Sequence, residues 1–468
     1  MKTLFAQSAL TKVVVLVLLI LFAGLPLARI AGLIDERGQS RQHAAQELAV
    51  RHAGPQVLAG PFLVIPYTER WVEEQLDDKG QPKAHVPRSK QRAHIVFPER
   101  ADLRGKLDAQ ERYLGIFNIL FYDLHGTLTG RFPAFDPASL PRTEKASTLE
   151  AQPPVLAMAL SDLRGLQGAP VLRVAGEGGR WQPRVPGLPQ DSWLAGGIHA
   201  PLPAGAQKAF DARQPLAFDV QMVVVGQERL SIVPLADENT AQLSSNWPHP
   251  SFGGEFLASR RSVTDKGFEA QWSVSSLVSS ARTQLLQAAK PERGAPASAA
   301  MALDSFDISL IEPLNVYAMT ERAVKYGLLF VGLVLMAAFM FELFARLRLH
   351  PVQYGLVGLS ITLFFLLLLA LSEKIAFSLA YASAAGASTL LLTVYFSAVL
   401  RGWKRGLGLG VYVGVLYAAL YGLLSSEDNA LLLGSLLLFG LLGLLMLGTR
   451  RVDWYALSSR TPPAAASA

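Results

Sequence analysis

Five long apolar runs in the C-terminal third constrain this chain more than any other feature. Each has roughly 18–25 residues, and a helix of that length, rising about 1.5 Å per residue, crosses a hydrocarbon core of about 30 Å. Because the bilayer core holds no water, each run must satisfy its own backbone hydrogen bonds, and a helix does so. The five runs, which predict a membrane bundle over residues 326–448, are Tyr326–Ala345, Val352–Leu371, Ile375–Val399, Leu407–Leu424 and Ala430–Leu447.

A sixth apolar segment lies near the N-terminus. The short segment 1–12 carries Lys2 and Lys12, and a run that is broken mainly by Arg29 follows over residues 13–34. That run is long enough to cross a bilayer, so we interpret it as an uncleaved anchor, with a cleaved signal peptide as the alternative. Either interpretation exports the residues that follow.

Residues 35–322 form one long segment without membrane character. It opens with a helical pattern over Asp35–His52, which Gly54-Pro55 ends. Short apolar and alternating runs then predict a mostly β, sandwich-like domain, with two lobes divided near the loop-rich residues 137–154. The predicted strands are Gln56–Tyr67, Ala93–Phe97, Val155–Leu160, Ala217–Val225 and Glu228–Leu235.

Two of these strands are close enough in sequence to suggest a hairpin. Val223–Val225 and Arg229–Val233 flank Gly226-Gln227, which has turn-forming character. In the first predicted strand, Gly60–Tyr67 contains Pro61 and Pro66, and we expect these prolines to mark its ends.

The charges of the short loops predict the orientation in the membrane. Six membrane helices place both chain ends, residues 1–12 and 449–468, on the same side. The loops on that side carry seven basic residues, whereas the opposite loops carry one, Lys374. The positive-inside rule therefore places both ends in the cytoplasm and the large domain outside. The seven basic residues are Arg346, Arg348, Arg401, Lys404, Arg405, Arg450 and Arg451.

The formal net charge of +6 follows in part from these loops. We therefore predict the lipid bilayer as a partner and no nucleic acid.

No familiar catalytic motif occurs in the chain. The G-x-S-x-G elbow, the H-E-x-x-H zinc helix and the G-x-x-x-x-G-K-[ST] phosphate loop are all missing. The absence of cysteine excludes disulfides and thiolate metal sites, and the eight histidines are scattered without ligand spacing. We predict no catalytic residue, no metal and no cofactor. A metal site assembled only in three dimensions is the alternative.

Ionisable residues are rare in the membrane runs, so each deserves an interpretation. Glu342 lies four residues before Arg346, a spacing that predicts an i,i+4 ion pair at the interface, with a functional intramembrane carboxylate as the alternative. Glu373 and Lys374 predict a turn between antiparallel helices, or a contact with the large domain. The remaining candidates for interface positions are Arg401, Lys404 and Arg405.

Small residues recur along the last two runs. Gly402, Gly406 and Gly410 are spaced by four, and Gly440 and Gly443 follow in the last run. Such residues permit close approach of helices. We expect packing within the bundle, with a homo-oligomer as the alternative.

The most distinctive stretch outside the membrane runs is Asn246–Phe256. Its two prolines restrict the backbone and its paired glycines permit a tight or left-handed turn. We expect either a rigid aromatic loop that closes the domain core or a binding loop for a partner protein or envelope ligand. A catalytic pair of His249 and Glu255 is a third interpretation. The candidate binding residues are Trp247, His249, Phe252, Gly253, Gly254 and Glu255.

Several stretches resemble the CreD family of inner-membrane proteins, and the resemblance covers nearly the whole chain, most densely after Asp304. The stretches are Gly60–Tyr67, Trp247–Phe256, Thr320–Tyr326, His350–Leu359, Ser372–Lys374, Arg401–Gly408, Ser426–Ser435 and Arg451–Tyr455.

The resemblance implies an inner-membrane protein of a Gram-negative bacterium, so the large domain, which the loop charges place outside, is expected in the periplasm. It further implies a role in cell-envelope integrity and envelope stress, under a carbon-source-responsive two-component system. No reaction is established for the family, so it supplies no catalytic residues.

Three functions follow as hypotheses. The first is a non-enzymatic envelope-integrity factor whose periplasmic domain binds a protein or envelope component. The second is a transporter or lipid-handling protein, which requires a cavity between helices, lined by Tyr417, Tyr421 and the hydroxyls near Ser383 and Ser388. The third is a periplasmic hydrolase, which requires His249 and Glu255 to share a pocket.

Overall fold

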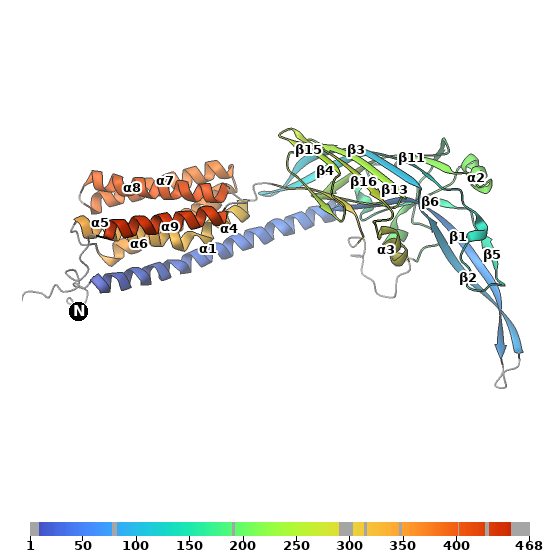
Figure 1. The fold of residues 1–468 in the computed structure, drawn as a ribbon, viewed down its shortest axis with the longest axis horizontal. Coiled ribbons are helices and arrows are strands. Elements are labelled where there is room, and N and C mark those ends of the chain that lie inside the picture. Colours follow the sequence, from blue (N-terminus) through green and yellow to red (C-terminus); the bar gives the residue numbers. More distant parts are fainter. Residues whose placement is uncertain are drawn as a thin grey trace, which may run out of the picture. The chain divides into compact units, whose positions relative to one another are not determined.

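The computed structural model describes residues 9–76, 82–189, 192–289, 303–312, 316–345, 349–400, 402–425 and 430–450. The chain divides into two compact units (Figure 1). The helical unit comprises Met1–Gln42 and Leu314–Ala468, and the β-rich unit comprises His43–Pro313.

Within the described part of the chain, the helical unit contains most of the first helix and the last six helices. Among the described residues, four helices are long and apolar enough to cross a membrane, or five if the pair α4–α5, bent by 45°, counts as one span. The last expected span coincides with α9, which is not among the helices counted here, so a total of six spans stays a prediction. The helices are α1 (Ala9–Arg51), α4 (Val316–Lys325), α5 (Gly327–Ala345), α6 (Pro351–Ser372), α7 (Phe377–Val399), α8 (Trp403–Ser425) and α9 (Ala430–Thr449).

Local signals account for the ends of two helices. The expected anchor and the helical pattern after it form one helix, α1, which continues through Pro26 and ends before Gly54-Pro55. At the start of α6, His350 and Gln353 form a capping box, and Pro351 occupies the first turn, where its missing N–H costs no hydrogen bond.

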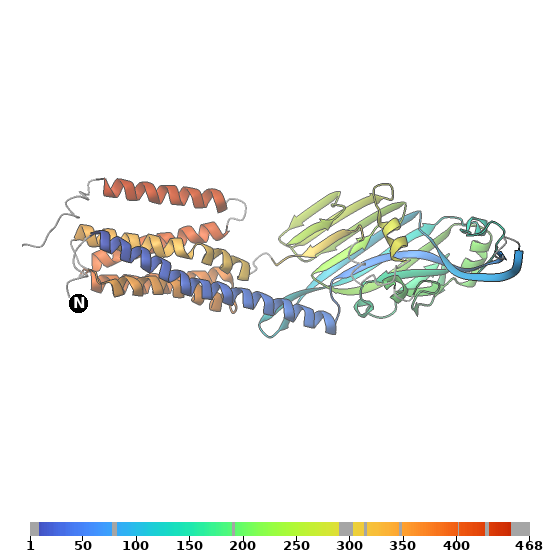
Figure 2. The same cartoon turned by 90° about the horizontal axis from the view of Figure 1, so that it is seen from below.

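Aromatic side chains and close helix contacts build the core of the helical unit. The rings of Phe364 and Tyr417 lie 4.4 Å apart between centroids. A Cβ at Gly406 or Gly410 of α8 would collide with Ser397 or Thr393 of α7, respectively. These two glycines therefore pack α8 against α7 within the molecule. In Figure 2, the N-terminal part of α1 runs along the other helices, and its buried side chains belong to the same core.

The β-rich unit consists of two sheets (Figures 1 and 2). Sheet A has the order β14-β17-β12-β1-β6-β10-β9, with β2 and β5 also paired to β1, and sheet B has the order β15-β16-β13-β3-β4-β11-β7-β8. The strands are β1 (Gln56–Leu76), β2 (Pro82–Val96), β3 (Arg100–Leu114), β4 (Phe117–Phe132), β5 (Thr148–Ala151), β6 (Val155–Leu160), β7 (Val171–Val174), β8 (Glu177–Gly179), β9 (Gln182–Pro183), β10 (Ile198–Pro201), β11 (Leu216–Gln227), β12 (Arg229–Val233), β13 (Glu238–Ser245), β14 (Pro250–Gly254), β15 (Arg260–Thr264), β16 (Gly267–Ser275) and β17 (Phe306–Leu310). The short helices are η1 (Pro137–Ser139), η2 (Leu163–Gly165), η3 (Trp193–Gly196), α2 (Ala204–Asp211) and α3 (Ala281–Ala288).

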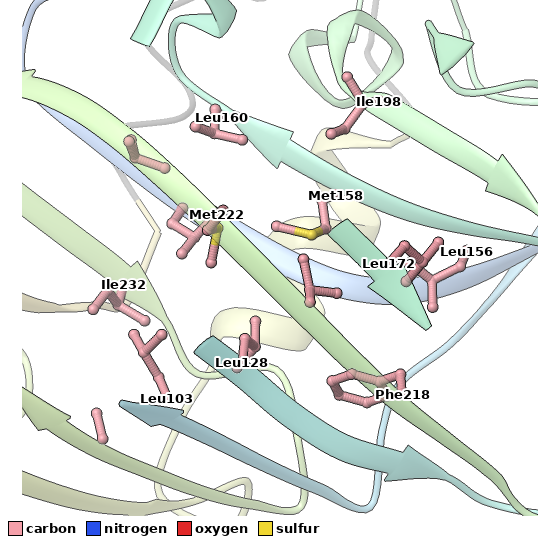
Figure 3. Packing of buried hydrophobic residues seen from close by; sticks show 14 of the residues in the cluster. Leu103, Leu128, Leu156, Met158, Leu160, Leu172, Ile198, Phe218, Met222 and Ile232 are labelled. Atoms are coloured by element: carbon pink, nitrogen blue, oxygen red, sulfur yellow. The ribbon is translucent and has the colours of Figure 1, made fainter. Parts of the chain in front are cut away.

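The main core lies between the two sheets. Figure 3 shows Leu156 and Met158 of β6 in the same cluster as Leu103, Leu128 and other side chains of sheet B. The other face of sheet A packs against η3 and α3, and the other face of sheet B packs against the last turns of α1. This layered arrangement agrees with the mostly β, sandwich-like domain expected from the sequence.

Strand β1 is the centre of sheet A and departs from simple alternation at one point. Leu58 and Leu63 face the main core, whereas Ala59 and Phe62 face α3, so the alternation shifts across Gly60–Pro61. The pairing with β6 is irregular at this place, as in a β-bulge. The strand passes through both prolines and continues to Leu76, so the prediction that prolines mark its ends is wrong.

The predicted hairpin is also wrong. Strand β11 pairs with β4 and β7 in sheet B, whereas β12 pairs with β1 and β17 in sheet A. The chain crosses between sheets at Glu228, which has φ +56°. The five predicted strands all exist, and β6 has the expected bounds.

Candidate functional site

The stretch predicted to bind a partner is built into the edge of sheet A. Residues Pro250–Gly254 form β14, which pairs with β17. The Trp247 indole donates a hydrogen bond to the carbonyl of Ile311 (2.9 Å). The ring of Phe252 meets the rings of Phe268 and Trp272 edge-on, at 5.4 and 5.8 Å. The aromatic residues of this stretch thus close the core.

A backbone requirement explains the second glycine of this stretch. Gly254 has φ +80°, and a Cβ there would collide with the carbonyl of Ser305. Because nearly all other residues avoid this conformation, glycine suits the end of β14 best. The next residue, Glu255, donates its N–H to the same carbonyl (2.8 Å). Gly253 lies within β14 itself.

The polar side chains of the stretch face solvent. His249 and Glu255 are both exposed. The His249 ring lies edge-on to Trp247, 6.1 Å away between centroids. Among the described residues, no hydrogen bond joins His249 to Glu255. Three of the candidate binding residues are exposed, namely His249, Gly254 and Glu255, and we call them the β14 rim.

The carboxylate of Glu342 is the polar centre of one end of the helical unit. It is only 2% exposed, accepts a 2.5 Å hydrogen bond from the Tyr354 hydroxyl and forms an ion pair with Lys12. The cluster joins α1, α5 and α6. The partner expected from sequence, Arg346, lies outside the described residues. Lys12 and Tyr354 were not predicted, although a carboxylate in an apolar run signals that some partner is required.

A second polar cluster lies about 25 residues further along α1. Arg37 approaches Glu373 at 3.6 Å, and the Tyr317 hydroxyl donates to the same oxygen at 3.4 Å. Glu373 follows α6 directly as its C-cap residue, and Lys374 beside it is exposed. The turn expected at Glu373–Lys374 therefore also joins α1 and α4 to the end of α6.

The structure describes two of the three basic residues that were expected at the membrane interface near the start of α8. Lys404 lies over the Trp403 ring at 5.9 Å, and Arg405 contacts the Leu400 carbonyl at 3.5 Å. Arg401 lies outside the described residues. Aromatic and basic residues at the start of α8 are typical of a membrane interface.

An apolar cleft of about 400 Å³ lies beside α1, between the positions of Lys12 and Arg37 along this helix. We call it the α1–α6 cleft. It is partly open to its surroundings. Its lining residues are Leu19, Phe22, Ala23 and Pro26 of α1, Leu335 of α5, and Pro351, Val352, Tyr354, Gly355, Leu356, Gly358, Leu359 and Thr362 of α6.

The α1–α6 cleft does not include Tyr417 or the other residues that were expected to line a cavity. Tyr417 is 2% exposed, and its hydroxyl lies 2.9 Å from that of Ser388. The Tyr381 hydroxyl donates to the Tyr417 carbonyl (2.7 Å), and the Tyr381 and Tyr421 rings are 5.1 Å apart. These contacts place the rings in the core of the helical unit, whereas the α1–α6 cleft lies beside α1.

The β-rich unit contains one buried carboxylate with an unusually complete set of donors. Glu69 is inaccessible to solvent and accepts hydrogen bonds from the backbone of Thr143 and Glu144 and from the hydroxyls of Thr143 and Ser147. Burial alone raises the pKa of this carboxyl, but the four hydrogen bonds outweigh that effect and lower the pKa to about 2. Glu69 thereby ties β1 to the segment before β5.

This depressed pKa predicts a specific pH dependence of stability. The folded-state pKa of Glu69 lies below the ordinary value of 4.5, so its contribution to stability is present above about pH 4.5 and is lost as the pH falls toward 2. Glu69→Gln is expected to lower the unfolding temperature by several degrees at neutral pH, and the difference from the native chain should shrink between pH 4.5 and 2. Thermal unfolding at a series of pH values measures this.

Glu73→Gln is the matched control on the same strand. Its carboxylate is half exposed and pairs with Arg88 at 2.7 Å, an exposed contact worth little. A pH-independent loss of stability in Glu69→Gln would contradict the role assigned to its charge.

The described residues contain no group of three or more histidine, aspartate or glutamate side chains arranged to hold a metal ion.

Comparison with known proteins gives one consistent match in sequence. Residues 8–455 match the family described as "Inner membrane protein CreD". A curated relative, the inner membrane protein CreD of Escherichia coli (strain K12), is 33% identical over 434 residues, which cover 93% of this chain and 91% of that protein.

Solved structures give only remote similarity. A two-domain zinc metallopeptidase bound to L-arginine has a TM-score of 0.22 at 9% identity, and the alignment covers 46% of this chain and 42% of that one. A zinc metallopeptidase from Deinococcus radiodurans has a TM-score of 0.19 at 9% identity, with 38% of each chain covered. These scores are too low to carry any conclusion about this chain.

Proposed function

The chain belongs to the CreD family of inner membrane proteins, and from this premise we propose that it supports the integrity of the cell envelope without catalysing a reaction. In this proposal the helices form six spans with both chain ends in the cytoplasm. The β-rich unit lies in the periplasm and binds a protein or another envelope component there.

The observation that carries the proposal is the insertion of the β-rich unit, His43–Pro313, between the first membrane helix and the remaining helices. The segments on both sides of it include helices that are long and apolar enough to cross a membrane, so we place both of its ends at the same membrane. The excess of basic residues in the opposite loops supports an extracytoplasmic location for this unit.

The β14 rim is the surface that we assign to partner binding. The rim is held by its neighbours, because β14 pairs with β17 and Phe252 of β14 packs against Trp272 in the core, while His249 and Glu255 project to solvent. A rigid strand edge that presents a few polar side chains loses little conformational entropy on binding. That arrangement favours recognition over catalysis, because the two ionisable side chains are not hydrogen-bonded to each other.

Photo-crosslinking in living cells tests this function. A crosslinking amino acid at position 249 is expected to form a discrete adduct with a periplasmic or envelope component, whereas the same amino acid at Val171, which is 55% exposed, should form none. Glu255→Lys should abolish the adduct, and the matched change Glu269→Lys, at an exposed side chain of β16, should leave it intact.

Two outcomes would overturn the proposal. Adducts with cytoplasmic proteins alone would contradict the periplasmic location. A turnover by the purified chain that His249→Ala or Glu255→Gln abolishes would replace the binding role with an enzymatic one.

A further inference from the structure

We infer that the α1–α6 cleft holds one acyl chain of a membrane phospholipid. This inference requires only that the helices lie in the membrane, and it is independent of the envelope role proposed above. It rests on the chemistry of the cleft, on its length and on the way its two ends are fixed.

The residues that line the cleft favour an apolar ligand. The two side-chain hydroxyls that line it are already satisfied, since Thr362 donates to the carbonyl of Gly358 (2.9 Å) and Tyr354 donates to Glu342 (2.5 Å). The remaining lining is hydrocarbon or glycine. A polar ligand would lose its hydrogen bonds to water here without gaining new ones. An acyl chain only moves from one apolar environment to another.

The length of the cleft matches one leaflet. Its lining on α6 extends from Pro351, at the helix start, to Thr362. Eleven steps of about 1.5 Å give roughly 17 Å, about half of a hydrocarbon core of about 30 Å. A cleft that runs from the membrane edge to the middle suits a lipid chain of that leaflet. A helix of a second protein would need the full thickness.

Ion pairs fix α1 on both sides of the cleft, and a glycine lies between them. Lys12 and Glu342 join α1 to α5 at one end, and Arg37 and Glu373 join α1 to the turn after α6 at the other. Between them, a Cβ on Gly355 would lie 3.8 Å from a methyl carbon of Leu19, in ordinary contact. An empty apolar cleft forfeits the dispersion contacts of its walls, and a lipid chain restores them.

The rim of the cleft is accessible from the bilayer. Phe22 is 67% exposed, Val352 61% and Leu356 49%. These exposed apolar side chains lie at the edge of the cleft, so a lipid chain can reach it without crossing a polar barrier.

A photoactivatable phospholipid tests the inference. The full chain is reconstituted into vesicles of phosphatidylethanolamine and phosphatidylglycerol that contain a phosphatidylethanolamine with a diazirine in its acyl chain. Peptide mapping is expected to find several-fold more label on Leu19–Pro26 and Pro351–Thr362 than on the exposed face of α7 at Leu390, Leu391 and Val394.

Variants that fill the cleft provide the decisive comparison. Gly355→Leu should reduce the label on both cleft segments to the level of α7. Gly386→Leu is the matched control, because a Cβ at Gly386 has open space around it, and it should change nothing. Ala23→Phe fills the cleft from the opposite helix and is used if Gly355→Leu fails to fold.

The outcomes separate the occupants. Uniform label over all lipid-facing helices, or label that persists in both folded cleft-filling variants, would overturn the inference. A cleft that takes no label while the chain migrates as a dimer would show that a second copy covers it, which would overturn the inference as well.

Discussion

Lys12→Met is expected to lower the free energy of unfolding of the helical unit by about 3 kcal/mol. Removal of the ammonium group leaves the Glu342 carboxylate, which is 2% exposed in the native chain, without this cation, while the Tyr354 hydroxyl still donates to it. An uncompensated buried charge costs far more than the loss of an exposed ion pair. Thermal unfolding in detergent micelles, followed by circular dichroism, measures the loss.

A double-mutant cycle identifies the pair as the cause. Glu342→Gln removes the charge but keeps an acceptor for Tyr354, so the double variant Lys12→Met/Glu342→Gln should regain most of the lost stability. Lys325→Met is the control, because Lys325 is 68% exposed and pairs with Glu321 four residues earlier. Equal losses in Lys12→Met and Lys325→Met, or strictly additive effects in the cycle, would refute the buried pair.

Trp272→Ala is expected to destabilise the β-rich unit by about 4 kcal/mol. The Trp272 ring is among the largest fully buried side chains, stacks on Phe306 with centroids 5.2 Å apart and meets Phe252 edge-on. Its loss leaves a large cavity directly under β14 and β17, so the β14 rim should also become more accessible to protease. Unfolding of the full chain and limited proteolysis report the two effects.

Trp272→Phe separates packing from hydrogen bonding. The buried indole N–H makes no hydrogen bond to a described protein group. Replacement by phenylalanine should therefore cost much less than replacement by alanine. Tyr113→Ala, at a side chain that is 65% exposed, should have little effect. Similar losses in Trp272→Phe and Trp272→Ala would show that packing of the ring is not the source of the stability.

The elements that depend on local composition were predictable. The apolar length of a membrane helix and the run of apolar residues in Val155–Leu160 are properties of short windows, and the structure has elements at these places. Strand pairing is not such a local property. The two strands of the expected hairpin, β11 and β12, belong to different sheets. Their separation follows from partners far away in sequence, β4 for one and β1 for the other.

The polar contacts of the helical unit show the same limit. Glu342 could be recognised as a residue that needs a partner, but Lys12 is 330 residues away in sequence. The nearer candidate, Arg346, satisfied the local helix spacing and was therefore preferred. Likewise, Trp247 and Phe252 were visible as an aromatic group, whereas their contacts with Ile311 and Trp272 depend on sheet pairing.

The central position of β1 sets a kinetic order for folding. This strand is synthesised early, yet one of its edges pairs in parallel with β12, where Gln56 meets Leu230, and β12 in turn requires β17. Contacts so distant in sequence close large loops, and such topologies fold slowly. Until residue 310 has been made, β1 or β12 exposes an unpaired edge, which is a risk for aggregation. The β-rich unit therefore completes its fold only after nearly all of it has emerged, immediately before the first helix of the C-terminal bundle.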